Sequence, residues 1–137
     1  MILVDTGPLV ALFDPRDERH NRCRKILKKI REPILTTTPV LTEAFHMLGP
    51  ASIGSDRLRD FVQQGGLSVW FFDGAWLTRT FELMERYADH PMDLADASLI
   101  AAAEAVGAQR VFTIDRKEFE TYRVRRGHRQ HPVAIVS

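Results

Sequence analysis

The chain has 137 residues, of which 45% are hydrophobic and 27% charged, and its formal net charge at pH 7 is +1. This size and balance are typical of one folded domain over residues 1–137 and exclude a disordered chain. The single cysteine, Cys23, excludes an internal disulfide framework and favours a reducing compartment. No apolar run approaches the roughly 20 residues of a membrane span, and the first residues contain no basic leader. We therefore expect a cytoplasmic protein that does not insert into a membrane.

The first half of the chain is predicted to alternate strands and helices. Ile2–Val4 is a short apolar run that ends at Asp5, and Pro8 opens the first turn of a helix. Thr38 is the expected cap of a later helix, with Pro39 at its first position. The expected elements are a strand at 2–4, helices at 8–13 and 17–31, a strand at 34–37, and helices at 39–48 and 54–64.

The second half continues this alternation. Asp73 can cap one helix, and Gly107 can end another in a left-handed conformation. The expected elements are a strand at 67–72, helices at 74–88 and 93–106, and strands at 110–114 and 132–136. Strands and helices in this rhythm predict a three-layer α/β/α fold around a mostly parallel central sheet of about five strands.

Acidic residues stand where the elements of such a fold would meet. Asp5 ends the first strand and Asp115 the fourth, and the carboxyl ends of parallel strands border the binding crevice. Asp93 and Asp96 share one face at the start of a helix. Glu43 has apolar neighbours early in another helix, which favours a buried position. Each acid alone could be a cap, a turn residue or an exposed helix residue. Together they predict a cluster of carboxylates in the crevice.

A cluster of carboxylates calls for a compensating cation, because the negative charges otherwise repel each other. Hard divalent cations prefer oxygen ligands, and Mg²⁺ takes one or two carboxylates directly while keeping several waters. The five histidines and the single cysteine form no set with zinc spacing. The sequence therefore favours Mg²⁺ or Mn²⁺ over a soft metal.

Basic residues concentrate in two segments. Between Arg16 and Glu32, eight Lys or Arg stand against three acids, and four arginines and two histidines lie between Arg123 and His131. Such segments are either solvated surfaces or contacts for the phosphates of a polyanion. The candidate phosphate contacts are Arg22, Arg24, Lys25, Lys28, Lys29, Arg116, Arg125 and Arg126.

The ordered set of these motifs resembles the PIN-domain family of metal-dependent ribonucleases, particularly the VapC-like toxins of toxin–antitoxin pairs. The resemblance covers nearly the whole chain. It rests on the segments ILVDTGPLVALF at 2–13, TEA at 42–44, MDLADASLIA at 92–101, and VFTIDR at 111–116 followed by Phe119.

The resemblance implies a set of site residues. The residues that match the family's four catalytic acids are Asp5, Glu43, Asp96 and Asp115. One or two Mg²⁺ or Mn²⁺ ions would be bound directly by Asp5, Asp96 and Asp115, with Glu43 and Asp93 acting through water. Thr6, Thr113 and Asp93 match positions that support this site.

The resemblance also implies an activity and partners. The expected activity is endonucleolytic hydrolysis of RNA phosphodiester bonds, and the expected partners are the RNA substrate, a cognate antitoxin protein and a second copy of the chain. Aromatic side chains crowd the segment from Trp70 to Phe81. Most of them are expected in the core, with some available for an interface.

Other functions fit the sequence less well or stay open. An aspartyl-nucleophile phosphotransferase would need a second aspartate two residues after Asp5, where Gly7 stands. A receiver-type signalling domain would need a lysine just after a late strand, and Lys117 lies beyond Asp115 instead. Two alternatives remain, namely a non-catalytic PIN-like module that binds RNA or protein, and a PIN nuclease that processes RNA rather than acting as a toxin.

Overall fold

The computed structural model describes all residues from 1 to 137. Five strands form one sheet in the order β3-β2-β1-β4-β7, and every pairing in it is parallel. The strands are β1 (Ile2–Val4), β2 (Ile34–Thr37), β3 (Ser68–Trp70), β4 (Arg110–Phe112) and β7 (Ala134–Val136). This arrangement confirms the predicted α/β fold with a parallel sheet of five strands.

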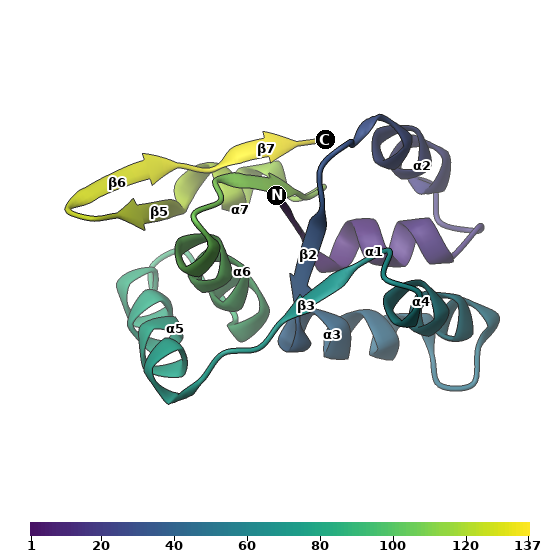
Figure 1. The fold of residues 1–137 in the computed structure, drawn as a ribbon, viewed down its shortest axis with the longest axis horizontal. Coiled ribbons are helices and arrows are strands. Elements are labelled where there is room, and N and C mark those ends of the chain that lie inside the picture. The colour runs from purple at the N-terminus through teal and green to yellow at the C-terminus, as the bar shows by residue number, and fades with distance from the viewer.

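Helices cover both faces of the sheet. They are α1 (Thr6–Phe13), α2 (His20–Lys29), α3 (Thr38–Leu48), α4 (Ile53–Gln63), α5 (Gly74–Arg86), α6 (Leu94–Val106) and α7 (Arg116–Thr121). Figure 1 shows α1, α2 and α4 on one side of the sheet and α5 and α6 on the other, which gives the expected three layers. None of these helices has the length and hydropathy that crossing a bilayer requires.

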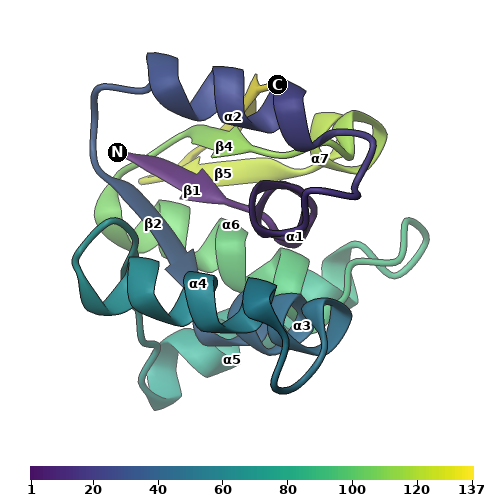
Figure 2. The ribbon, with the colours of Figure 1, turned by 90° about the vertical axis from the view of Figure 1, so that its right-hand side faces the viewer.

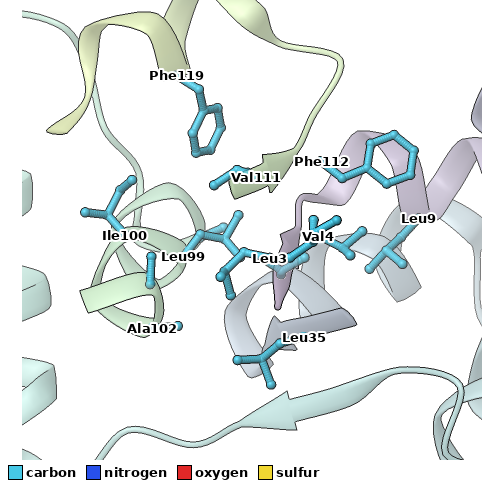
Figure 3. Close-up of a cluster of buried hydrophobic side chains, with 14 of the residues drawn as sticks. Leu3, Val4, Leu9, Leu35, Leu99, Ile100, Ala102, Val111, Phe112 and Phe119 are labelled. Atoms are coloured by element: carbon cyan, nitrogen blue, oxygen red, sulfur yellow. The ribbon is translucent and has the colours of Figure 1, made fainter. Parts of the chain in front are cut away.

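The central strands are buried on both faces, as is usual for parallel sheets covered by helices. Every residue of β1 and β2 is buried, and 29 buried apolar residues form one continuous cluster. Side chains from β1, β4, α6 and α7 meet in this cluster (Figure 3). The core therefore fixes the strand ends from which the predicted acidic residues project.

Several element ends differ from the sequence prediction: the strands expected at 67–72 and 110–114 stop at Trp70 and Phe112, α1 begins at Thr6, and α5 ends at Arg86. Two helix starts differ for a clear reason. The cap of α3 is Thr37, whose hydroxyl accepts a hydrogen bond from the Val40 amide, so Thr38 is the first helical residue and not the cap. Helix α2 begins at His20 instead of Asp17, because the Asp17 carboxylate forms a turn with the amide of Arg19. Gly107 ends α6 with φ 70°, in the left-handed conformation expected there.

Three elements near the C-terminus were not predicted. They are α7 and the antiparallel hairpin of β5 (Arg123–Arg126) and β6 (Arg129–Pro132), which extends beside the main sheet in Figure 1. The hairpin lacks regular apolar alternation, since only Val124 among its strand residues is buried. The turn is made by Gly127, whose φ of 60° favours glycine. The strand expected at 132–136 is shorter, because Pro132 belongs to β6.

Candidate active site

The site lies where the strand order reverses. From β1 the chain moves outward to β2 and β3, and it then returns to place β4 and β7 on the other side of β1. In open α/β sheets, ligands bind beyond the carboxyl ends of the strands at such a switch point. Asp5 directly follows β1 and Thr113 directly follows β4. Figure 2 shows β1 running into α1 at this end of the sheet, with α7 on the same side.

Thr113 connects the two strand ends. Its hydroxyl donates to Asp5 Oδ2 at 2.9 Å and accepts from the Asp115 amide at 2.9 Å, and its side chain is fully buried. The other oxygen of Asp5 accepts from the Thr6 amide at 2.8 Å, at the start of α1. Gly7 lets the start of α1 lie close to the segment that follows β4, since a Cβ at this position would lie only 2.6 Å from Ile114 Cγ1. These bonds fix the carboxylate of Asp5 and the backbone of Asp115, which lies three residues beyond the end of β4.

Helix α6 contributes two more acids from its first turn. Asp93 caps the helix by accepting from the Asp96 amide at 2.8 Å. The helix is anchored to β2 by the buried hydroxyl pair of Ser98 and Thr37, 2.6 Å apart. As a result Asp96 is buried beside Asp5, while Asp93 stays exposed at the rim. The Tyr122 hydroxyl lies 3.4 Å from Asp96 Oδ2 and donates to it.

Glu43 reaches the site from α3. Its Oε1 accepts a 2.7 Å hydrogen bond from the Thr6 hydroxyl. The expectation of a buried position for Glu43 is wrong, because Val40 and Ala44, four residues apart, form the buried face of α3 and leave Glu43 exposed. Thr6 therefore connects the start of α1 to an exposed carboxylate at the edge of the site.

Glu118 is an additional acid that the sequence analysis missed. Asp115 caps α7 by accepting from the Glu118 amide at 3.4 Å, so Glu118 lies one turn into that helix. An aspartate followed three residues later by a glutamate is typical of a helix start, and this spacing could have predicted α7. Together with Glu118, the predicted acids form the carboxylate cluster: Asp5, Glu43, Asp93, Asp96, Asp115 and Glu118.

Burial and mutual repulsion raise pKa values in the carboxylate cluster. Burial raises the pKa of Asp5 from 3.8 to about 6, although the hydrogen bonds from Thr6 and Thr113 oppose this change. Burial, followed by the charges of Asp93, Asp5 and Glu118, raises the pKa of Asp96 to about 8. Glu118 is exposed at the surface, but desolvation by its neighbours and then the charge of Asp115 raise its pKa to about 7. The negative charges in the cluster are therefore not balanced by the protein itself.

The donor set suits a hard divalent cation. No Lys, Arg or His side chain forms an ion pair with any member of the carboxylate cluster. Every available ligand atom is an oxygen, as Mg²⁺ and Mn²⁺ prefer. No three of the acids are already arranged as ligands of one metal ion. Mg²⁺ does not require this, because one or two carboxylates and several waters complete its coordination.

The site is open to solvent between two helices. A cavity of about 400 Å³ lies between the starts of α3 and α6, and Glu43 and Asp93 are among its lining residues. Thr42 and Leu94 contribute a hydroxyl and an apolar surface to the same cavity. Solvent therefore reaches the two rim acids, Glu43 and Asp93, through this cavity.

The predicted phosphate contacts differ in how they are used within the fold. The five basic residues on α2 are exposed and form no ion pair, namely Arg22, Arg24, Lys25, Lys28 and Lys29. Arg125 is exposed on the hairpin, whereas Arg126 donates to the Gly107 carbonyl and Arg116 donates to the Ser137 hydroxyl. Contact of these residues with phosphate stays a prediction.

Comparison with known proteins gives consistent matches along the chain. The family model described as PIN domain matches residues 2–124. Ribonuclease VapC26 of Mycobacterium tuberculosis is 20% identical over 125 residues, which cover 89% of this chain and 92% of that protein.

Among solved structures, the fold is similar to that of several toxins. Mycobacterium tuberculosis VapC20, described as a sarcin–ricin loop cleaving toxin, matches with a TM-score of 0.78 and 18% identity over 86% of this chain and 92% of its own. A toxin–antitoxin complex from Klebsiella pneumoniae matches with a TM-score of 0.69 and 18% identity, over 88% and 92% of the two chains. VapBC2 from Rickettsia felis, bound to a promoter DNA fragment, matches with a TM-score of 0.65 and 17% identity, over 98% and 97%.

Proposed function

Because this chain belongs to the PIN-domain family, we propose that it is a divalent-metal-dependent endoribonuclease that hydrolyses RNA phosphodiester bonds and acts as the toxin of a toxin–antitoxin pair. One observation carries the proposal: six carboxylates meet at the switch point of the sheet, two of them buried, and none has a cationic partner. The names of the relatives, a ribonuclease and an RNA-loop-cleaving toxin, support RNA as the substrate.

The acids of the carboxylate cluster would bind the metal in two ways, some directly and some through coordinated water. Asp5, Asp96 and Asp115 would share the direct binding of one or two Mg²⁺ or Mn²⁺ ions, with one or two of these carboxylates on each ion, and Glu43 and Asp93 would hold coordinated waters. A bound divalent cation lowers the pKa of a coordinated water and offsets the charge that develops on the phosphate oxygens. Thr113 and Thr6 keep the carboxylates of Asp5 and Glu43 in fixed orientations by hydrogen bonds of 2.9 and 2.7 Å.

Basic residues outside the cluster would bind the rest of the RNA. The exposed side chains of α2, with Arg116, Arg125 and Arg126, would contact phosphates along the strand and so offset the repulsion between RNA and the acidic crevice. Arg126 would have to do so while its guanidinium also donates to the carbonyl at the end of α6.

Two protein partners complete the proposal. A cognate antitoxin is supported by the neighbours that were solved as toxin–antitoxin assemblies. A second copy of this chain would use the aromatic surface near the edge strand β3. Trp70 packs edge-on against Phe72 and Trp76, but Phe71 and Phe81 remain exposed, at 72% and 54%. Exposed aromatic side chains are common at protein interfaces.

The proposal is tested by incubating purified protein with end-labelled RNA in Mg²⁺, Mn²⁺ or EDTA. We expect internal cleavage that EDTA abolishes and that falls more than about 100-fold in Asp5→Asn and Asp96→Asn, since even outer partners of a metal ligand are worth about 10- to 100-fold. Asp73→Asn is the matched control, because Asp73 caps α5 outside the cluster and asparagine caps equally well.

Cleavage that persists in EDTA or in Asp96→Asn would contradict the proposed site. A folded wild-type protein that binds RNA and Mn²⁺ but cuts no RNA would favour the non-catalytic module. Cleavage without growth arrest on expression would favour a processing nuclease over a toxin.

A further inference from the structure

Each of three carboxylates in the cluster accepts a hydrogen bond from a side-chain hydroxyl. Thr113 donates to Asp5, Thr6 donates to Glu43, and Tyr122 donates to Asp96. The threonines were expected to support the site, but the tyrosine was not, because it lies 26 residues from Asp96 in the sequence. We propose that Tyr122 is a positioning residue for the reaction, and that its hydroxyl fixes the orientation in which Asp96 binds the divalent cation. This inference rests on the proposed function, in which Asp96 is a metal ligand.

The contact leaves Oδ1 of Asp96 free of side-chain partners. Tyr122 donates to Oδ2 over 3.4 Å and no other side chain donates to this carboxylate, which otherwise faces only the backbone amide of Asp93. Asp96 is 8% exposed and Tyr122 is 1% exposed, so water has little access to the side of the carboxylate that the tyrosine covers. A carboxylate held at one oxygen presents the other to a cation in a defined direction, which is the usual role of the outer partners of metal ligands.

Tyr122 is itself held in place by two neighbouring aromatic side chains, with which it forms an aromatic group of three rings. Its ring packs edge-on against Tyr87 and Phe119, with centroid distances of 5.2 Å in both pairs. The Tyr87 hydroxyl accepts from the Arg123 amide at 3.0 Å, and the Arg123 guanidinium donates to the Tyr122 carbonyl at 2.9 Å. The Tyr122 hydroxyl is therefore already in place before a cation binds. Binding then loses little entropy from ordering Tyr122 and Asp96, because folding has ordered both side chains.

The same aromatic group provides a matched control. Tyr87 and Tyr122 touch each other and both use their hydroxyls, but Tyr87 bonds to backbone and only Tyr122 bonds to a carboxylate of the cluster. If Tyr122 served only to pack and stabilise this region, removing either hydroxyl would change the unfolding temperature and the Kd for Mn²⁺ to a similar extent. If it positions Asp96, only removal of the Tyr122 hydroxyl would change the binding of a metal ion.

The test is titration of the purified protein with Mn²⁺ by calorimetry, together with thermal unfolding in EDTA, for wild type, Tyr122→Phe and Tyr87→Phe. We expect Tyr122→Phe to raise the Kd for Mn²⁺ about tenfold, since outer partners of metal ligands are typically worth about 10- to 100-fold. Tyr87→Phe should leave that Kd unchanged, because it keeps the aromatic ring that packs against Tyr122 and removes only a hydroxyl that bonds to backbone. In an Asp96→Asn background, Tyr122→Phe should have no further effect on Mn²⁺ binding, because the two groups act as one unit.

RNA cleavage gives a second readout. The Tyr122→Phe enzyme should lose rate at low Mn²⁺ and recover most of it when Mn²⁺ is raised tenfold, whereas a misfolded protein would not recover. Equal Mn²⁺ affinity in wild type and Tyr122→Phe, or an equal loss in Tyr87→Phe, would overturn the positioning role and leave the proposed function intact. Failure of the wild-type protein to bind Mn²⁺ would overturn both.

Discussion

Asp5 and Asp96 are buried carboxylates, each 8% exposed, and neither is paired with a cation. Aspartate is rarely buried without a charged partner or a metal. The hydrogen bonds from Thr113 and Tyr122 satisfy individual oxygens but do not supply a positive charge. In the absence of a bound cation these two residues therefore lower the stability of the folded protein whenever they are ionised.

This cost predicts an unusual dependence of stability on pH. The pKa values of Asp5, Glu118 and Asp96 are raised to about 6, 7 and 8, so between pH 4 and 8 the folded state binds more protons than the unfolded state. Stability then falls as pH rises through this window. In EDTA, the unfolding temperature should decrease between pH 5 and pH 8.5, and saturating Mn²⁺ should reverse the decrease.

Asp96→Asn tests the origin of this effect, since asparagine cannot ionise. Its unfolding temperature in EDTA should fall less between pH 5 and pH 8.5 than that of wild type. Asp60→Asn, an exposed position on α4 outside the cluster, should keep the wild-type slope. If the unfolding temperature depended on pH in the same way in wild type and Asp96→Asn, Asp96 would not titrate between pH 5 and pH 8.5.

Among the single elements, helix α6 is held in place by hydrogen bonds near both of its ends. Its first turn carries Asp93 and Asp96, and Ser98 binds it to β2. Farther along, Glu104 accepts two hydrogen bonds from Arg79 of α5, at 2.8 and 3.0 Å, and one from the Arg125 amide of β5 at 2.9 Å. One carboxylate therefore joins two helices and the hairpin.

Loss of this carboxylate should destabilise the fold strongly. Glu104 is 4% exposed and Arg79 11%, so Glu104→Ala would leave a buried guanidinium without its partner. We expect the free energy of unfolding in urea to fall by roughly 3 kcal/mol. Glu82→Ala removes the other acid that pairs with Arg79, but Glu82 is 57% exposed and its loss should cost less than about 1 kcal/mol. Similar effects of the two changes would contradict this assignment.

The sequence predicted the elements that follow simple local rules. Short apolar strands ending in Asp5 and near Asp115, a proline at the start of α3 and Gly107 after α6 were sufficient to place most of the sheet and its helices. The hairpin was missed because its stability comes from contacts distant in sequence, such as that of Arg125 with Glu104. Glu118 was missed with α7, the six-residue helix that carries it. Tyr122 could not be found because only the tertiary fold brings it to Asp96.

At the scale of the whole molecule, charge is separated into an acidic crevice and basic surfaces. The five basic side chains of α2 are exposed and free of ion pairs, although the net charge of the chain is only +1. If they bind phosphates, each contact contributes about 0.7 to the slope of log K against log salt for single-stranded RNA.

Replacement of the five α2 residues by glutamine should therefore reduce that slope by up to about 3.5. RNA binding would be measured by fluorescence anisotropy in an Asp96→Asn background, so that the RNA stays intact. Arg57→Gln with Arg59→Gln on α4 controls for a general loss of positive charge. An unchanged slope in the five-residue variant would exclude α2 from the RNA interface, and the same comparison with Arg116, Arg125 and Arg126 replaced would test the C-terminal contacts.

A divalent cation that balances the carboxylate cluster would be located by anomalous X-ray scattering from crystals of the protein soaked in Mn²⁺. We expect one or two anomalous peaks beside Asp5 and Asp96, at the carboxyl ends of β1 and β4, and no such peak in Asp96→Asn crystals. Peaks only elsewhere on the surface, or none in wild-type crystals at saturating Mn²⁺, would contradict this expectation.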